Sequence, residues 1–254
     1  MSYTELMPDE RIDTVNEKIR LIQKKDGLTF GTDAFLLAAF IKQQRYSYAV
    51  ELGGGTGIIS LLCAAADKFL NIDCFEIQKD FYGITKRNIE LNGFGDRVRV
   101  FNEDIRSVSA AFLKSEADAV FSNPPYMRTD SGKRNECDRK FIARHEVCGG
   151  IDDFCAAAYR ILKHGGRFYC VWRPDRLTSL IASMRANRLE PKNMVFVHSD
   201  VQSEPSMVLM SATKGGAEGM KIMPPLFLHE PYDGVGKSRE MTERAKKIYD
   251  TLEF

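Results

Sequence analysis

The chain has 254 residues, of which 44% are hydrophobic and 28% are charged, so it can bury a full core as one α/β domain with small additions. Its net charge of +1 excludes a globally polybasic protein, so any basic surface for a nucleic acid has to be local. The polar N-terminus and the lack of any apolar run of about 18 residues argue against a signal peptide or membrane span and favour the cytoplasm.

The six cysteines show no C-x-x-C pair, and the four histidines are scattered. A metal site would need clustered ligands at regular spacing, so we expect no metal. Buried, reduced thiols are the simpler interpretation. The cysteines are Cys63, Cys74, Cys137, Cys148, Cys155 and Cys170.

The first elements in chain order are a hairpin-like segment at residues 19–31 and a helix at residues 32–44. From about residue 48 to 173, apolar runs alternate with helical patterns, which is typical of βαβ units in a parallel sheet. Strands are predicted at 48–52, 71–77, 97–104, 117–125 and 167–173. Helices are predicted at 57–69, 78–91, 151–166 and 175–189.

Two more strands, residues 193–199 and 206–214, follow each other without an intervening helix. The pattern therefore predicts an α/β fold with a seven-stranded mixed sheet, one antiparallel strand and flanking helices. We divide the chain into an N-terminal hairpin and helix packing on the core (1–47), a central domain (48–213) and a C-terminal extension of that domain (214–254).

A glycine-rich turn follows the first of the five strands, in "VELGGGTGIIS". Gly53, Gly55 and Gly57 permit a tight turn and close approach of the backbone to a ligand, although a plain turn would also fit. The G-x-G-x-G spacing differs from the G-x-G-x-x-G of a pyrophosphate binder. Glu51 lies directly before the turn, where it can accept an ammonium group.

Two more carboxylates close the next two strands. Glu76 follows about 20 residues after the glycines, where a carboxylate can accept both hydroxyls of a ribose. Asp104 can accept from an exocyclic adenine amine, or it can be a turn or helix N-cap aspartate. Glu76 can likewise be a plain charge at a strand end.

The fourth of these strands stops at Asn123-Pro124-Pro125-Tyr126, because neither proline can donate to a sheet ladder. Asn123 precedes a proline and is pushed to extended geometry. The result is a stiff strand end that presents an amide, a phenol ring and backbone carbonyls. A polar loop is expected to follow at residues 127–140.

Together these residues resemble the motifs of the Rossmann-like S-adenosylmethionine (SAM) methyltransferases, and "NPPY" is similar to the enzymes that methylate amino groups. The segments "GLTFGTDAFLLAAF", "RNIELNG", "ARHE" and "KGG…PPL" look like the bacterial tRNA (adenine-N6)-methyltransferase family, whose members modify the adenine 3′ of the anticodon of a valine tRNA. The resemblance covers nearly the whole chain. It implies a Rossmann-like fold, SAM as cofactor, tRNA as substrate and a methyltransferase domain at residues 48–213.

The resemblance gives the strand end a catalytic role. An exocyclic amine is a poor nucleophile because its lone pair is delocalised, and two acceptors aimed at its N–H bonds favour the reactive pyramidal form. We expect the Asn123 oxygen and the Pro124 carbonyl to be these acceptors. Tyr126 would stack on the target base, with Pro125 beside it in the substrate site.

Other residues receive roles by resemblance alone. Phe30 and Thr32, with Gly31 and Asp33 beside them, would line the methionine end of SAM. Thr32 as an N-cap and Asp33 as a dipole-matched acid explain the same segment structurally. His145 would border the target pocket, and Lys133 and Arg134 could contact phosphates, although all three also fit an ordinary charged segment.

The motifs leave other acceptors open: guanine N2 of rRNA, adenine N6 of DNA, or a glutamine amide of a release factor. The short segment before the glycine turn favours tRNA over the glutamine substrate. A SAM- or RNA-binding module without catalysis is the alternative of another class, and the intact Asn123 and Tyr126 argue against it.

Overall fold

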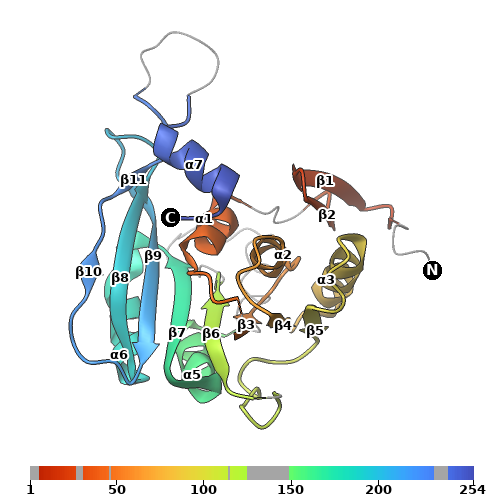
Figure 1. The fold of residues 1–254 in the computed structure, drawn as a ribbon, viewed down its shortest axis with the longest axis horizontal. Coiled ribbons are helices and arrows are strands. Elements are labelled where there is room, and N and C mark those ends of the chain that lie inside the picture. Colours follow the sequence, from red (N-terminus) through yellow and green to blue (C-terminus); the bar gives the residue numbers. More distant parts are fainter. Residues whose placement is uncertain (1–5, 27–30, 46, 114, 125–148, 232–239) are drawn as a thin grey trace, which may run out of the picture.

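The computed structural model describes residues 6–26, 31–45, 47–113, 115–124, 149–231 and 240–254. Their strands form a two-stranded hairpin and a nine-stranded sheet (Figure 1). The strands are β1 (Glu10–Asn16), β2 (Ile19–Lys24), β3 (Tyr48–Leu52), β4 (Asn71–Phe75), β5 (Val98–Phe101), β6 (Ala117–Ser122), β7 (Leu162–Trp172), β8 (Leu189–His198), β9 (Pro205–Lys214), β10 (Lys221–Ile222) and β11 (Leu226–Phe227). The helices are α1 (Thr32–Phe40), α2 (Ile58–Ala65), α3 (Lys79–Leu91), α5 (Ile151–Ile161), the 3-10 turn η1 (Pro174–Arg176), α6 (Leu177–Ala186) and α7 (Glu243–Thr251).

The seven longer strands of the large sheet run in the order β8-β9-β7-β6-β3-β4-β5, and β9 pairs antiparallel with both of its neighbours. The predicted mixed sheet with one antiparallel strand is thus confirmed. The predicted count of seven is wrong, because β10 and β11 pair parallel with β8 and bring the sheet to nine strands. Each of the two has only two residues, too few for an alternating pattern to show.

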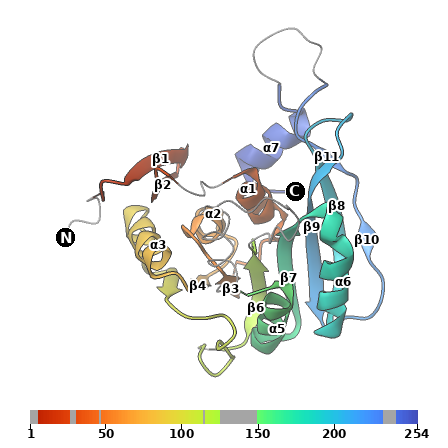
Figure 2. The same ribbon diagram turned by 180° about the vertical axis from the view of Figure 1, so that it is seen from behind.

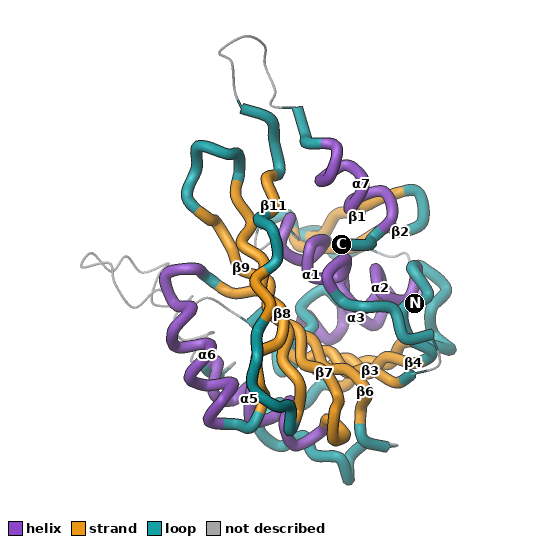
Figure 3. The backbone as a smooth tube through the Cα atoms, turned by 60° about the vertical axis from the view of Figure 1, so that its left-hand side comes forward, coloured by secondary structure: helices purple, strands orange, loops and turns teal. Residues whose placement is uncertain are grey.

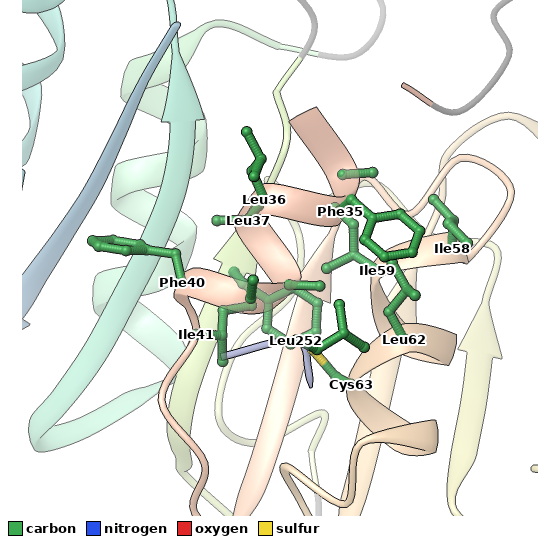
Figure 4. Packing of buried hydrophobic residues seen from close by; sticks show 14 of the residues in the cluster. Phe35, Leu36, Leu37, Phe40, Ile41, Ile58, Ile59, Leu62, Cys63 and Leu252 are labelled. Carbon is green, nitrogen blue, oxygen red and sulfur yellow. The ribbon is translucent and has the colours of Figure 1, made fainter. Parts of the chain in front are cut away.

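Helices cover both faces of this sheet, so alternate residues of each strand enter different cores (Figures 2 and 3). Ala119 and Phe121 of β6 pack with α1, α2 and α7, whereas Val120 packs with α5 and α6. Figure 4 shows α1 on the first face, with Phe35 lying against Ile59 of α2. The described cysteines are buried and unpaired, namely Cys63, Cys74, Cys155 and Cys170.

Four helices end before the predicted residue: α1 at Phe40, α2 at Ala65, α5 at Ile161 and α6 at Ala186. Helix α1 ends at Phe40 rather than at residue 44, and the buried Lys68 ammonium donates to the carbonyls of Ala39 and Ile41 there. Burial lowers the pKa of this lysine. Helix α5 ends at Ile161 rather than at the glycine pair, because Leu162 is extended and already pairs with Ala117 as the first residue of β7.

The hairpin β1–β2 lies against α3 through paired side chains. The Asn88 amide donates to Ile22 O at 3.0 Å and accepts from Ile22 N at 2.7 Å. Arg87 makes a two-armed ion pair with Glu10, which holds the pKa of that carboxyl below its usual value.

The division of the chain at residues 47 and 213 stays a prediction. None of the described helices combines the length and the apolar character that crossing a membrane would need.

Candidate active site

The candidate site lies where the parallel strands β3, β4, β5 and β6 end together at the carboxyl edge of the sheet (Figure 1). In open α/β sheets ligands bind at this edge. The glycine turn follows β3, Glu76 follows β4, Asp104 follows β5, and Asn123 follows β6. The sheet therefore brings together four of the segments that the sequence singled out.

The glycine turn has a shape that other residues would find strained. Gly53, Gly55 and Gly57 have φ angles of +72°, +56° and +79°. The amides of Gly53 and Gly54 donate to Phe75 O at 2.9 and 3.0 Å, so β4 fixes the start of the turn. No atom of the described residues lies within 4 Å of where a Cβ on Gly55 would stand, which leaves space beside this backbone.

Gly54 stands between the glycines of the G-x-G-x-G pattern, which leaves its own identity open. A Cβ at Gly54 would lie 2.0 Å from the sulfur of buried Cys74. Only glycine fits there while Cys74 keeps its place. The second glycine of the G-G-G run is therefore required by packing behind the turn, and no spacing rule could have shown this.

Glu76 connects the turn to the second strand. Its carboxylate accepts from Gly55 N and Gln78 N, both at 2.8 Å, and the residue is 4% exposed. Burial raises its pKa, although the two backbone N–H groups oppose that shift. An acidic group is thus held beside the open space at Gly55.

Glu51 faces inward rather than toward the turn's surface. It is 1% exposed, and its carboxyl accepts from the Ser60 amide at 3.1 Å and from the Ser60 hydroxyl. Burial raises the pKa of Glu51 to about 8, and the nearby Glu76 adds to the rise. Its role as acceptor of an ammonium stays a prediction, and it requires that ligand to reach a buried side chain.

Asp104 lies in a turn and is paired within it. Its carboxylate accepts from the Arg106 backbone at 2.9 Å and from the Arg106 guanidinium at 2.9 and 3.0 Å. The Arg106 side chain lowers the pKa of Asp104. The geometry agrees with a turn aspartate, and the contact with an adenine amine stays a prediction.

Asn123 contacts a residue that lies 90 positions earlier in the sequence. Its side-chain nitrogen donates to Oδ2 of Asp33 at 2.8 Å. Asp33 lies in the first turn of α1, and its Oδ1 accepts from Ala34 N at 2.9 Å. The N-cap of α1 is Gly31 rather than the predicted Thr32, so the N-cap residue offers no side chain to cap this end of the helix. Pro124 is buried after Asn123.

A cleft of about 640 Å³ opens beside Asp33. Its walls come from the start of α1, the end of β7 with η1, and the turn into β9. Trp172 lines this cleft although it is 4% exposed, and its Nε1 donates to Arg176 O at 3.2 Å. The lining residues are Thr32, Asp33, Trp172, Arg173, Pro174, Asp175, Glu204, Pro205, Ser206 and Met207.

Several candidate residues lie outside the described part of the chain, and their roles stay predictions. They are Phe30, Pro125, Tyr126, Lys133, Arg134 and His145. Among the residues described, no three His, Cys, Asp or Glu side chains are grouped to hold a metal ion.

Comparison with known proteins decides the family. Residues 24–189 match the family model of the methyltransferase small domain, which is more than half of the chain. The chain belongs to this methyltransferase family. A tRNA1(Val) (adenine(37)-N6)-methyltransferase of Phocaeicola vulgatus is 30% identical over 71% of this chain and 75% of its own. One of the same name from Dyadobacter fermentans is 25% identical over 86% of this chain and 89% of its own.

The fold agrees with this family. A crystal structure described as a "predicted O-methyltransferase" from Agrobacterium tumefaciens superimposes with a TM-score of 0.69, at 22% identity, over 87% of this chain and 97% of that one. The protein is a Rossmann-like, SAM-dependent methyltransferase. SAM is its cofactor, and solved neighbours of the fold include complexes with it or an analogue. The open space at Gly55 and the buried Glu76 carboxylate fit this group.

Proposed function

We propose that this enzyme methylates the exocyclic N6 of an adenine in tRNA, at position 37 of a valine tRNA. The observation that carries the proposal is the placement of Asn123 at the end of β6, joined to Asp33, at the same sheet edge as the glycine turn and Glu76. The names of the two relatives support the substrate.

The residues divide the work as follows. SAM supplies an electrophilic methyl group when it is bound. Glu76 would accept the ribose hydroxyls, and the turn from Gly53 to Gly57 would let the backbone approach the cofactor closely. The side-chain oxygen of Asn123 and the carbonyl of Pro124 would accept hydrogen bonds from the two N–H groups of the adenine amine, so that its lone pair points at the methyl group. The product loses a proton readily, so no strong base is required.

The cleft beside Asp33 supports an extruded nucleotide as the acceptor. Its volume of about 640 Å³ falls within the usual range for small-ligand sites, which is roughly 300–1,000 Å³. The lining carries three acidic side chains, Asp33, Asp175 and Glu204. It carries one basic side chain, Arg173, whose guanidinium is paired with Asp175. The cleft therefore suits a base and a sugar better than phosphates. The proposal includes phosphate contacts by Lys133 and Arg134. It also includes stacking of Tyr126 on the target base, with Pro125 beside it and His145 at the border of the pocket.

Labelled SAM and total tRNA from a strain that lacks the gene provide the test. After incubation, digestion and mass spectrometry should show N6-methyladenosine in one tRNA. A valine tRNA transcript with guanine at position 37 should remain unlabelled, and Asn123→Ala should incorporate label about 10²–10³-fold more slowly. Label in rRNA, DNA or a release factor, with none in tRNA, would assign the enzyme to one of the other amino acceptors.

A further inference from the structure

We propose that Asp33 is the positioning residue of the methyl transfer, which holds the Asn123 amide with its oxygen toward the acceptor amine. The inference rests on the proposed role of Asn123. Asn123 Nδ2 lies 2.8 Å from Asp33 Oδ2. A carboxylate only accepts hydrogen bonds, so this contact requires the nitrogen of the amide on that side and places the oxygen on its other arm.

Orientation matters because the two arms of an amide have opposite chemistry. The acceptor amine offers two N–H donors, so an oxygen from Asn123 stabilises the reactive geometry, whereas an NH₂ group would oppose it. An asparagine amide has nearly the same shape after a turn of 180°, so its hydrogen bonds rather than its packing decide which arm faces the acceptor. The Asp33 contact selects one of these two orientations before the substrate binds.

Asp33 is itself held in place. Its Oδ1 accepts from Ala34 N at 2.9 Å in the first turn of α1, a helix whose residues from Ala34 to Phe40 are buried. The other oxygen, Oδ2, is the one that meets Asn123. A side chain on a buried helix is a firmer support than one on a loop, and it links the N-terminal segment to the strand end 90 residues later.

Two substitutions separate orientation from charge. Asp33→Asn and Asp33→Ala both remove the negative charge. In Asp33→Asn the amide oxygen still accepts from Ala34 N, which leaves an NH₂ group facing Asn123. Asn123 must then turn its oxygen toward residue 33 and its own NH₂ toward the substrate. We expect the single-turnover rate to fall about 100-fold in Asp33→Asn but only about 10-fold in Asp33→Ala, where residue 33 no longer favours either orientation of the Asn123 amide.

A double-mutant cycle shows through which residue Asp33 acts. Once Asn123 is alanine, the further change Asp33→Ala should lower the rate less than twofold, because the group it positions is gone. SAM affinity by calorimetry should stay within about threefold in every variant. Glu243→Gln, which removes an exposed acid from the first turn of α7, is the matched control for loss of helix-terminal charge, and its rate should not change.

An NMR measurement keeps this test separate from the identity of the substrate. The side-chain amide signal of Asn123 is assigned by its absence in Asn123→Ala, and it should shift in Asp33→Asn without any acceptor present. If the Asp33 variants lose SAM affinity by the same factor as they lose rate, the inference is overturned and Asp33 is a cofactor contact. An unchanged signal in Asp33→Asn, or additive rates in the cycle, would also overturn it. A lack of tRNA methylation by the wild-type enzyme would instead refute the proposed function.

Discussion

The two halves of the site are built in different ways. The proposed cofactor half consists of Glu51 in β3 with the glycine turn after it, Glu76 after β4 and, at its rim, Asp104 after β5, which all lie at neighbouring strand ends. The proposed acceptor half joins Asp33, Asn123 and the cleft walls on β7, η1 and β9, which come from four distant segments. The first half is defined mainly by backbone shape, the second by side chains that meet only in the fold. Variants of the two halves should therefore fail in different ways.

The largest effect should come from the acceptor half. Asn123→Ala should lower the turnover number about 10²–10³-fold, as loss of one preorganised polar partner does, while SAM affinity stays unchanged. Steady-state kinetics and calorimetry measure the two quantities. Asn193→Ala is the control, because it also removes an asparagine hydrogen bond, to Ser211, but on β8 and β9 away from the site. Parallel loss of SAM binding in Asn123→Ala would show that the two halves are not separate.

Glu76→Ala should weaken SAM binding and change the rate of methyl transfer little, which is the reverse of the effect of Asn123→Ala. A hydrogen bond to a charged group contributes about 1.5–3 kcal/mol, so SAM should bind about 10–100-fold more weakly. The single-turnover rate at saturating SAM should change far less. Exposed Glu90 on α3 offers the control variant Glu90→Ala, which should bind SAM normally. If SAM affinity does not change in Glu76→Ala, the ribose contact lies elsewhere.

The shape of the cofactor half depends on packing behind it. Gly54→Ala places a methyl group 2.0 Å from the Cys74 sulfur and should lower the free energy of unfolding by about 1–3 kcal/mol. Combining it with Cys74→Ala removes the clash and should recover part of that loss. Urea denaturation of the two single variants and the double variant measures this. Additive losses would mean that the clash is not the cause.

The same difference explains what the sequence could and could not reveal. The order of strands and helices from β3 to β9, and the positions of Gly53, Gly55, Gly57 and Glu76, follow from local patterns. The hairpin predicted at residues 19–31 is wrong, because β2 pairs with the preceding strand β1 instead. The contact between Asp33 and Asn123 spans 90 residues, and the need for glycine at position 54 depends on a cysteine 20 residues later. The strands β10 and β11 are too short to leave a pattern. Interactions that form only through tertiary packing leave no local pattern in the sequence from which they could be predicted.

The free energy of unfolding should depend on pH because of Glu51, the buried carboxyl group of the cofactor half. The folded protein keeps the Glu51 proton up to about pH 8, whereas an unfolded glutamate loses it near 4.5. The folded state therefore binds more protons between these values, and the free energy of unfolding should fall as the pH rises through that window. Glu51→Gln cannot ionise and should reduce this slope. Denaturation at pH 5, 6, 7 and 8 compares the two proteins, and equal slopes would contradict the buried, protonated Glu51.

The smallest effects concern Asp104, at the outer rim of the cofactor half. Its partner Arg106 has a side chain that is 46% exposed, and exposed ion pairs contribute about 0–1 kcal/mol, so Arg106→Ala should hardly change the free energy of unfolding. SAM affinity distinguishes the two roles open to Asp104. If its carboxylate accepts from the adenine amine, Asp104→Ala should weaken SAM binding about 5–10-fold, as loss of one hydrogen bond of about 1 kcal/mol does, while Arg106→Ala should leave binding equal or slightly tighter. Unchanged binding in both variants would make Asp104 a turn residue only and would restrict the cofactor half to the glycine turn and Glu76.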